Sequence, residues 1–376
     1  MFNRVLVTGG AGFIGSHLVD LLIERGYKVR VFDNLEPQVH GDTDKPPAYL
    51  NPEAEFVRGN VLDRDALLKA LDGVDAVVHD AAMVGVRQSQ YQIYRYTHVN
   101  TSGTANLLDV LANEKTKVQR LLVASSMSIY GEGMYRRPSD GKLVCPFLRP
   151  DEQMEKHDFE MRDPETNEMM DPVATPETKP LFCTSVYSLS KKDQEEYCLC
   201  VGRFHKIQTV ACRFFNVYGS RQSLSNPYTG AAAIFASRIK NDNPPILYED
   251  GEQMRDFIHV RDLVEAKLFL LENPKANLEP YNICTGTGTS IKTLSRLLAK
   301  LHGRPGLEPE VTGKFRAGDI RHCFGDPSKL AALGWKFSIP LDEGLRRLVE
   351  WSENVEAIDN VEQAHKELEA HGLVRG

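Results

Sequence analysis

A buried strand that runs into a glycine-rich turn constrains this chain more than any other feature. Residues 5–15 read Val-Leu-Val-Thr-Gly-Gly-Ala-Gly-Phe-Ile-Gly, an apolar run followed by glycines and then an apolar helix. In such a turn one glycine makes the bend, one lets backbone approach a pyrophosphate, and one lets the helix pack on the strand. The pattern predicts a dinucleotide site whose contacts here are Gly9, Gly12, Phe13, Ile14 and Gly15.

The second predicted strand, residues 28–33, ends in an acid. Asp33 follows Gly15 by eighteen residues. A carboxylate at this place accepts hydrogen bonds from the adenosine ribose hydroxyls and repels a 2′-phosphate. Asp33, with the adjacent Asn34, therefore predicts NAD rather than NADP as the cofactor.

Strand and helix patterns alternate through the first two hundred residues. Strands are expected at 4–8, 28–33, 55–58, 76–79, 120–124 and 208–214, and helices at 13–25, 65–71, 100–113 and 185–205. Regular alternation indicates a parallel sheet covered on both faces. The predicted fold class is α/β, a Rossmann-type doubly wound parallel sheet with a smaller C-terminal mixed α/β lobe.

The domain boundaries follow from where this alternation stops. We expect residues 1–219 to form the NAD-binding domain, with its sheet completed by about 256–284, and residues 220–255 with 285–376 to form the substrate lobe. Residues 132–180 are Pro-rich and highly charged, too long for an ordinary connection. This insertion is expected to be a functional or disordered loop.

Composition excludes several other classes of protein. The net charge is -7, and the Lys and Arg residues are scattered, which argues against a nucleic-acid partner. No apolar run approaches the ~20 residues of a membrane span, and the first residues run directly into a strand, so we expect a cytoplasmic protein without a membrane partner. Seven cysteines without metal-ligand spacing predict free thiols and no metal site.

A second motif predicts acid–base chemistry. Tyr187 and Lys191 are four residues apart and lie on one face of a predicted helix. A Lys ammonium near a phenol favours the phenolate, so we expect Lys191 to lower the pKa of Tyr187. Ser125 and Ser126 follow the fifth strand, where hydroxyls line the ligand crevice of such sheets.

Together these motifs resemble one family, the extended short-chain dehydrogenases/reductases, and within it the NDP-sugar epimerases and dehydratases. The resemblance covers residues 2–350 and rests on the motifs at 7–15, 79–82, 99–100, 125–126, 213–219 and 255–260 and on Tyr187 with Lys191. It implies Ser126, Tyr187 and Lys191 as catalytic residues. It further implies cofactor contacts at Asn60, Val61, Ala81, Ala82, Asn100, Tyr187, Lys191 and Phe214. The implied substrate contacts are Val86, Ser126, Ser128, Asn216, Arg255, Arg316 and Asp319.

Two other residues are weighed less heavily. Arg321 is an additional phosphate candidate, and His259 is expected to be a core histidine or to support a ligand-binding residue.

The residues after Ser126 bear on the reaction. Dehydratases of this family carry an Asp-Glu pair there, whereas this chain has Met127 and Ser128. The resemblance therefore implies an NAD-dependent epimerase that inverts C4 of an NDP-sugar through a 4-keto intermediate. The alternatives are a keto-sugar-nucleotide reductase or dehydrogenase and a non-catalytic NAD-binding regulatory protein.

Finer features of the resemblance concern substrate and assembly. The insertion 132–180, in combination with residues 81–89 and 318–323, is similar to dTDP-L-rhamnose 4-epimerases, with UDP-hexoses as the other candidate substrates. The insertion is expected to cap the sugar end of the cleft. Asp80 departs from the family's usual apolar residue and is expected to be solvated or matched to a cation. The family implies a homodimer formed through helices 100–113 and 185–205.

Overall fold

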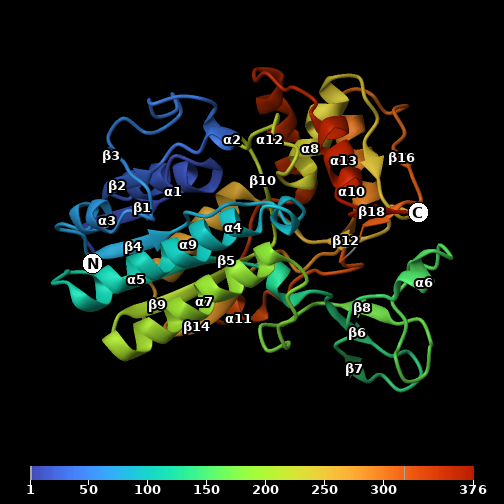
Figure 1. Ribbon diagram of the computed structural model, residues 1–376, viewed down its shortest axis with the longest axis horizontal. Coiled ribbons are helices and arrows are strands. Elements are labelled where there is room, and N and C mark those ends of the chain that lie inside the picture. Colours follow the sequence, from blue (N-terminus) through green and yellow to red (C-terminus); the bar gives the residue numbers. More distant parts are fainter. Residues whose placement is uncertain (1, 317) are drawn as a thin grey trace.

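Seven parallel strands form the central sheet of the computed structural model, which describes residues 2–316 and 318–376 (Figure 1). Their order is β14-β9-β5-β4-β1-β2-β3. The strands are β1 (Arg4–Thr8), β2 (Lys28–Asp33), β3 (Glu55–Arg58), β4 (Ala76–His79), β5 (Arg120–Ser126), β9 (Gln208–Phe214) and β14 (Glu279–Ile283). The strand order reverses between β1 and β4, and such a switch point opens a ligand crevice at the carboxyl ends of the strands.

Helices cover both faces of this sheet. One face carries α1 (Phe13–Glu24) and α9 (Val260–Glu272), and the other carries α3 (Arg64–Ala70), α5 (Gly103–Asn113) and α7 (Val186–His205). Side chains alternate between the two cores. Val5 and Val7 pack with α1 and α9, whereas Leu6 packs with the opposite layer, as the two-residue period of a strand requires. The predicted Rossmann-type α/β fold is confirmed.

Two element boundaries differ from expectation by two or more residues. The fifth strand continues to Ser126, two residues beyond its predicted end. The predicted helix 100–113 begins as α-helix only at Gly103, because Thr97–Ser102 form a π-helical segment, η2, after α4 (Ile93–Tyr96). Such π segments are rare and often found at functional sites, and η2 contains Asn100.

A smaller lobe packs beside the sheet. Its core joins α8 (Ala231–Lys240), α10 (Ile291–Leu301) and α12 (Leu341–Glu353) through residues such as Phe235, Leu298 and Leu345. Four short strand pairs complete it: β10 (Asn216–Tyr218) with β13 (Phe257–His259), β11 (Ile246–Leu247) with β16 (Glu310–Val311), β12 (Met254–Arg255) with β15 (Thr289–Ser290), and β17 (Phe315–Arg316) with β18 (Val374–Arg375). The remaining elements are α2 (Pro37–His40), η1 (Gln88–Gln90), η3 (Met127–Tyr130), α11 (Ser328–Ala332) and α13 (Val361–Ala370).

The insertion 132–180 is a folded unit rather than a loop. Its strands β6 (Met134–Arg136), β7 (Leu143–Val144) and β8 (Asp171–Val173) form an antiparallel sheet. The short helix α6 (Asp151–Met154) lies between β7 and β8 in the chain. It projects from the end of the molecule opposite the N-terminus (Figure 1). Arg149 ties it to the smaller lobe through a buried ion pair with Glu249, at 2.9 Å. Charged side chains thus dock the insertion, which explains its polar composition.

None of the helices in the described residues is both long enough and apolar enough to cross a membrane.

Candidate functional site

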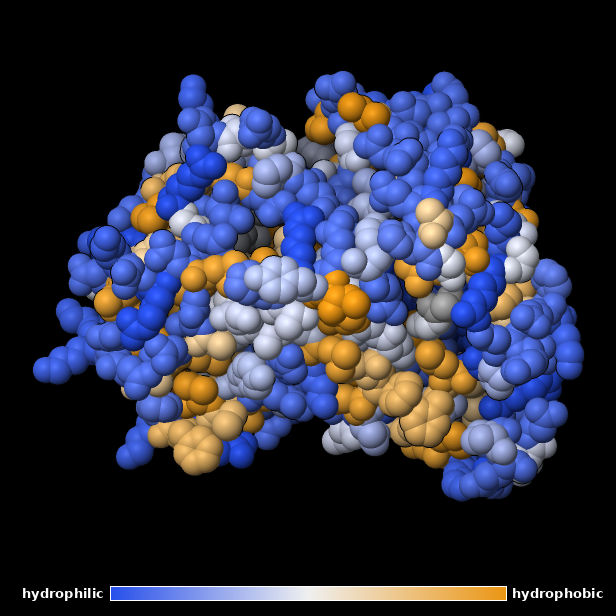
Figure 2. All heavy atoms as spheres, in the orientation of Figure 1, coloured by the Kyte–Doolittle hydropathy of each residue, from blue (hydrophilic) through white to orange (hydrophobic). Residues whose placement is uncertain are grey.

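A cavity of about 620 Å³ lies at the carboxyl ends of the strands, between the sheet and the smaller lobe. The molecular surface is hollowed between these two parts at the top of the view (Figure 2). Of the residues predicted for the site, all but Asn100 line this cavity. The described lining contains no residue of the insertion 132–180, so the expectation that the insertion caps the cleft is wrong. Its contact nearest the cavity is a hydrogen bond from Arg149 to the carbonyl of Asp319, which is itself a lining residue.

The glycine-rich turn forms one end of the cavity. A Cβ atom on Gly15 would lie 2.2 Å from the carbonyl oxygen of Gly9, and Gly9 itself adopts φ +70°. The helix α1 begins after Gly12 without a side-chain cap, while Gly12, Phe13 and Ile14 line the cavity. Uncapped N–H groups at a helix N-terminus bind phosphate, so this end is shaped for a pyrophosphate.

Asp33 lies beside this turn at the end of β2. One carboxylate oxygen accepts from the backbone N–H of Ala11 at 3.0 Å, and the other accepts from that of Leu35 at 2.9 Å. Because each oxygen has a further lone pair, the fixed carboxylate can still accept hydrogen bonds from a ribose. The Asp33 carboxylate, the glycine turn and the cavity walls at Asn60 and Val61 together suit a dinucleotide such as NAD.

The catalytic candidates meet in the cavity where β5 ends and α7 begins. Ser126 ends β5, and its hydroxyl accepts hydrogen bonds from the N–H and Oγ of Ser128, at 3.1 and 2.9 Å. Tyr187, in the first turn of α7, hydrogen-bonds to the Ser126 side chain. Ser185 caps α7 in a capping box, and Ser89 accepts from the N–H of Tyr187 at 3.0 Å. The first turn of α7 is thereby fixed against the cavity.

Burial controls the protonation of this pair. It raises the pKa of Tyr187 to about 12, although the hydrogen bond to Ser126 acts in the opposite direction. Burial also lowers the pKa of Lys191 to about 8, against the field of Asp80. The expectation that Lys191 lowers the pKa of Tyr187 is therefore wrong, because burial sets this pKa and the influence that opposes burial is the Ser126 hydrogen bond rather than the Lys191 ammonium.

A buried hydrogen-bond chain holds Lys191. Its Nζ donates to Oε1 of Gln194 at 2.7 Å, and Nε2 of Gln194 donates to Thr104 Oγ1 at 2.8 Å. Thr104 in turn lies 2.9 Å from Nε2 of His79. The sequence motifs did not indicate Gln194, although its spacing of three residues from Lys191 on a helix places both on one face.

Asn100 supports the wall instead of lining it. Its side chain accepts from the N–H of Met83 at 2.7 Å and donates to the Met83 carbonyl at 3.1 Å and to Ser190 at 2.9 Å. Both amide N–H groups and one of the two oxygen lone pairs are used within the protein, so Asn100 fixes Met83 and with it the adjoining Ala81 and Ala82. Direct contact between Asn100 and a cofactor is not part of this arrangement.

Asp80 is paired with a cation, which is one of the two arrangements expected for it from the sequence. Its carboxylate forms an ion pair with Lys267 of α9, and the two side chains are 7% and 0% exposed. The other oxygen of Asp80 is buried without a hydrogen-bond partner in the described structure. Lys267 also lies 5.4 Å from the centre of the Phe214 ring, which lines the cavity. Sequence spacing could not reveal Lys267, which is 187 residues away.

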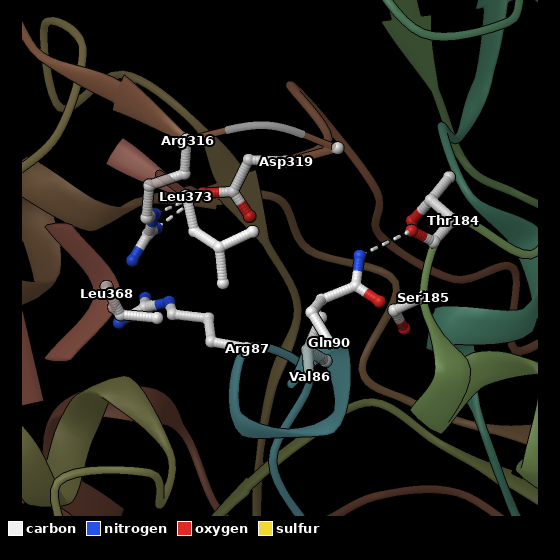
Figure 3. Close-up of a pocket in the computed structure, with 10 residues that line it drawn as sticks. Val86, Arg87, Gln90, Thr184, Ser185, Arg316, Asp319, Leu368 and Leu373 are labelled. Carbon is white, nitrogen blue, oxygen red and sulfur yellow. Dashed lines mark hydrogen bonds and ion pairs between the residues drawn. The ribbon is translucent and has the colours of Figure 1, made fainter. Parts of the chain in front are cut away.

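Four of the predicted substrate contacts, Asn216, Arg255, Arg316 and Asp319, lie at the smaller lobe. Arg316 lies 4.0 Å over the ring of Tyr248, and its Nε donates to Asp319 at 2.7 Å (Figure 3). Arg255 donates to the carbonyls of Met254, Ile320 and Arg321 at 2.8–2.9 Å. Asn216 Oδ1 and Arg316 Nη1 are buried without a partner within the described residues, as expected of atoms that await a ligand.

The structure excludes Arg321 as a phosphate ligand. Its side chain is fully buried and forms ion pairs with Glu249 at 2.9 Å, Asp250 at 2.6 Å and Glu160 at 2.5 Å. Three carboxylates already pair with its two terminal nitrogens, and its remaining nitrogen, Nε, is buried away from the cavity. His259 caps the N-terminus of α9 by accepting from the N–H of Arg261 at 3.2 Å. It is a structural histidine.

Comparison with known proteins places the chain in a family. Residues 5–153 and 164–284 match the model of the NAD dependent epimerase/dehydratase family. The dTDP-L-rhamnose 4-epimerase of Burkholderia thailandensis is 36% identical over 353 residues, covering 93% of this chain and 94% of that protein. The UDP-glucose 4-epimerase of Bacillus subtilis is 29% identical, covering 95% and 99% of the two chains.

Solved structures give the same picture. The UDP-glucose 4-epimerase of Thermotoga maritima with UDP-glucose superposes with a TM-score of 0.74 at 30% identity, covering 93% of this chain and 98% of the other. That of Thermus thermophilus, in complex with NAD, superposes with a TM-score of 0.73 at 29% identity, covering 94% and 100%. The matched family model spans more than half of the chain, including the glycine turn, Ser126, Tyr187 and Lys191. The chain belongs to the NAD-dependent epimerase/dehydratase family.

Proposed function

We propose that this protein is an NAD-dependent 4-epimerase of a nucleotide-diphosphate sugar. The observation that carries the proposal is the set of Ser126, Tyr187 and Lys191 around one end of the cavity. In the sequence, Ser126 is followed directly by Met127 and Ser128. Loss of water would require a further acid and base beside the reacting carbons. Met127 and Ser128 supply neither, whereas reversible oxidation of a carbinol needs only one proton-transfer group.

The chain's own residues divide this chemistry between them. Tyr187 takes the proton of the C4 hydroxyl as the phenolate, which is the minor form of this buried phenol at neutral pH, and the Ser126 hydroxyl donates to the developing oxyanion. Lys191, anchored by Gln194, provides positive charge beside the cofactor ribose. NAD, when bound by the glycine turn and Asp33, would supply reversible hydride transfer at C4. Rotation of the keto sugar in the cavity would present the other face of C4, and Tyr187 would restore the proton to the C4 oxygen.

The lining also supports particular substrates. Arg255, Arg316 and Asn216 provide positive and amide groups for a diphosphate. Met83, Val86 and Met127 provide apolar surface at the Tyr187 end. Such surface suits the methyl group of a 6-deoxy sugar, in line with the similarity to the dTDP-L-rhamnose 4-epimerase. We therefore favour dTDP-L-rhamnose, with UDP-hexoses as the second class.

An NMR assay of purified protein without added cofactor tests this proposal. The substrates are dTDP-L-rhamnose, UDP-glucose and UDP-N-acetylglucosamine, and Tyr187→Phe is the control. We expect a C4 epimer from one substrate, lost in the variant. Conversion only with stoichiometric added NAD or NAD(P)H would overturn the epimerase and support a reductase or dehydrogenase. No conversion, with bound NAD retained, would support a regulatory protein.

The same proposal assigns cofactor binding and substrate binding to different parts of the chain. Residues 1–219, with the sheet completed by 256–284, bind NAD, while residues 220–255 and 285–376 bind the sugar nucleotide. The cavity lining supports this division, because the glycine turn and Arg316 lie at its two sides.

The free cysteines are compatible with a reducing, cytoplasmic compartment.

We also propose a homodimer formed through α5, α7 and the adjoining α4. Large apolar side chains are exposed on α4 and α7, namely Ile93, Tyr94, Leu189, Tyr197 and Phe204. Orange surface interrupts the hydrophilic surface in this region (Figure 2). Covering these side chains by a second copy removes apolar area from water. Light scattering coupled to gel filtration should give twice the chain mass, and a Phe204→Glu variant should shift toward the monomer.

A further inference from the structure

The C-terminal helix α13 forms part of the cavity wall, opposite the sheet. Val361, Ala364, His365 and Leu368 of this helix line the cavity. Ala364 and Leu368 are buried, so the apolar face of the helix is turned toward the cavity. Figure 3 shows Leu368 and Leu373 facing Arg87 across a small side cavity, beside Arg316.

One carboxylate joins this helix to both sides of the cleft. Glu367 accepts hydrogen bonds from the hydroxyl of Tyr91, at 3.3 Å, and from that of Tyr228. Tyr91 follows η1 in the dinucleotide-binding part, and Tyr228 lies in the segment between β10 and α8. The two hydroxyls are themselves 2.8 Å apart, and the ring of Tyr91 stacks on His371 at 4.3 Å.

The C-terminal segment also contacts the predicted diphosphate ligands. Strand β18, which follows α13, pairs with β17 so that Val374 lies opposite Arg316. The hydroxyl of Tyr248 and Nδ1 of His365 are 2.5 Å apart, and the Tyr248 ring carries the Arg316 guanidinium. Displacement of this segment would therefore open the cavity and remove the strand pairing beside Arg316, while Asp319 and Tyr248 still hold its side chain.

From these contacts we infer that α13 and β18 form a lid over the sugar-nucleotide end of the cavity, latched by Glu367 to Tyr91 and Tyr228. This inference rests on the proposed function for the identity of the ligand. Because Glu367 contacts a tyrosine from each side of the cleft, the latch closes α13 over a bound nucleoside diphosphate and opens to widen the cavity for its entry. The apparent affinity for the nucleotide therefore depends on the fraction of molecules in the closed, binding-competent state.

The test compares Glu367→Gln with Glu362→Gln in the full chain. Glu362 is an exposed residue on the same helix, and its substitution removes the same charge without touching the latch. Calorimetry with UDP and with dTDP should show affinity about tenfold weaker in Glu367→Gln and unchanged in Glu362→Gln, since a charge-assisted hydrogen bond is lost from the closed state. Amide exchange in residues 361–376 should be faster in Glu367→Gln and slowed by either nucleotide in the wild type.

Equal affinity and equal exchange in Glu367→Gln and the wild type would overturn the lid. So would a wild-type chain that binds neither nucleotide, because the lid would then have no such ligand to close on. Nucleotide binding with protection of α13 but without C4 epimerisation would support the lid and overturn only the proposed reaction. Circular dichroism of each variant verifies that α13 and the rest of the fold remain intact.

Discussion

The ammonium group of Lys191 donates a 2.7 Å hydrogen bond to Gln194, one turn along α7. Gln194→Leu removes the acceptor and also the donor to Thr104. We expect kcat to fall about tenfold while KM for the sugar nucleotide stays near the wild-type value, because a misplaced Lys191 affects the reacting end of the cavity. Steady-state kinetics checks this. Gln194→Glu keeps an acceptor and should lose less; a Gln194→Leu enzyme with wild-type kcat would contradict the role.

Lys191 also makes stability depend on pH. Its pKa is lowered to about 8 by burial, from 10.5 in an unfolded chain. Between these values the unfolded state binds one more proton, so this group raises the free energy of unfolding as pH rises from 8 to 10.5. In Lys191→Met the stability gain over the wild type, on the order of 3 kcal/mol at pH 7, should shrink across that window. Urea unfolding at several pH values measures the difference, and a constant difference would refute it.

Tyr187 acts with the opposite sign at higher pH. Burial raises its pKa to about 12, from 10.0. Between these values the folded state binds one more proton, and the free energy of unfolding falls as pH rises. Tyr187→Phe should therefore lose less stability than the wild type above pH 10. Parallel denaturation curves for the two chains at pH 9 and pH 11 provide the comparison, and identical losses would exclude the buried phenol as a cause.

The Asp80–Lys267 pair should show strong coupling. Either Asp80→Leu or Lys267→Met alone leaves one buried charge uncompensated, which costs about 3–5 kcal/mol. The double variant removes both charges and should recover most of that loss. A double-mutant cycle by urea unfolding measures the coupling. Additive losses would mean that the two side chains act independently.

Gly15 is required for the dinucleotide turn. In Gly15→Ala the added Cβ would lie 2.2 Å from the Gly9 carbonyl oxygen, so the turn must open. We expect the purified variant to retain at least tenfold less NAD, since the pyrophosphate contacts depend on that turn. Absorbance and cofactor release on denaturation quantify it. Gly306→Ala, at a glycine whose Cβ would have no neighbour within 4 Å, is the control and should retain NAD normally.

Local patterns determined the fold class and much of the site. The two-residue period of the strands, the glycine turn and the Tyr187–Lys191 spacing depend only on neighbours in sequence, so the sheet and most of the cavity lining could be predicted. The same patterns described poorly the insertion 132–180, because its stability comes from ion pairs such as Arg149–Glu249 between distant segments.

Tertiary structure alone decided how these groups are charged and enclosed. Sequence showed Asp80 without its partner Lys267, offered Arg321 as a ligand although three carboxylates form ion pairs with it, and gave no sign that α13 lines the cavity. It also predicted that Lys191 would lower the pKa of Tyr187. Desolvation and long-range ion pairing depend on which segments meet in space, and spacing along a chain carries no record of that.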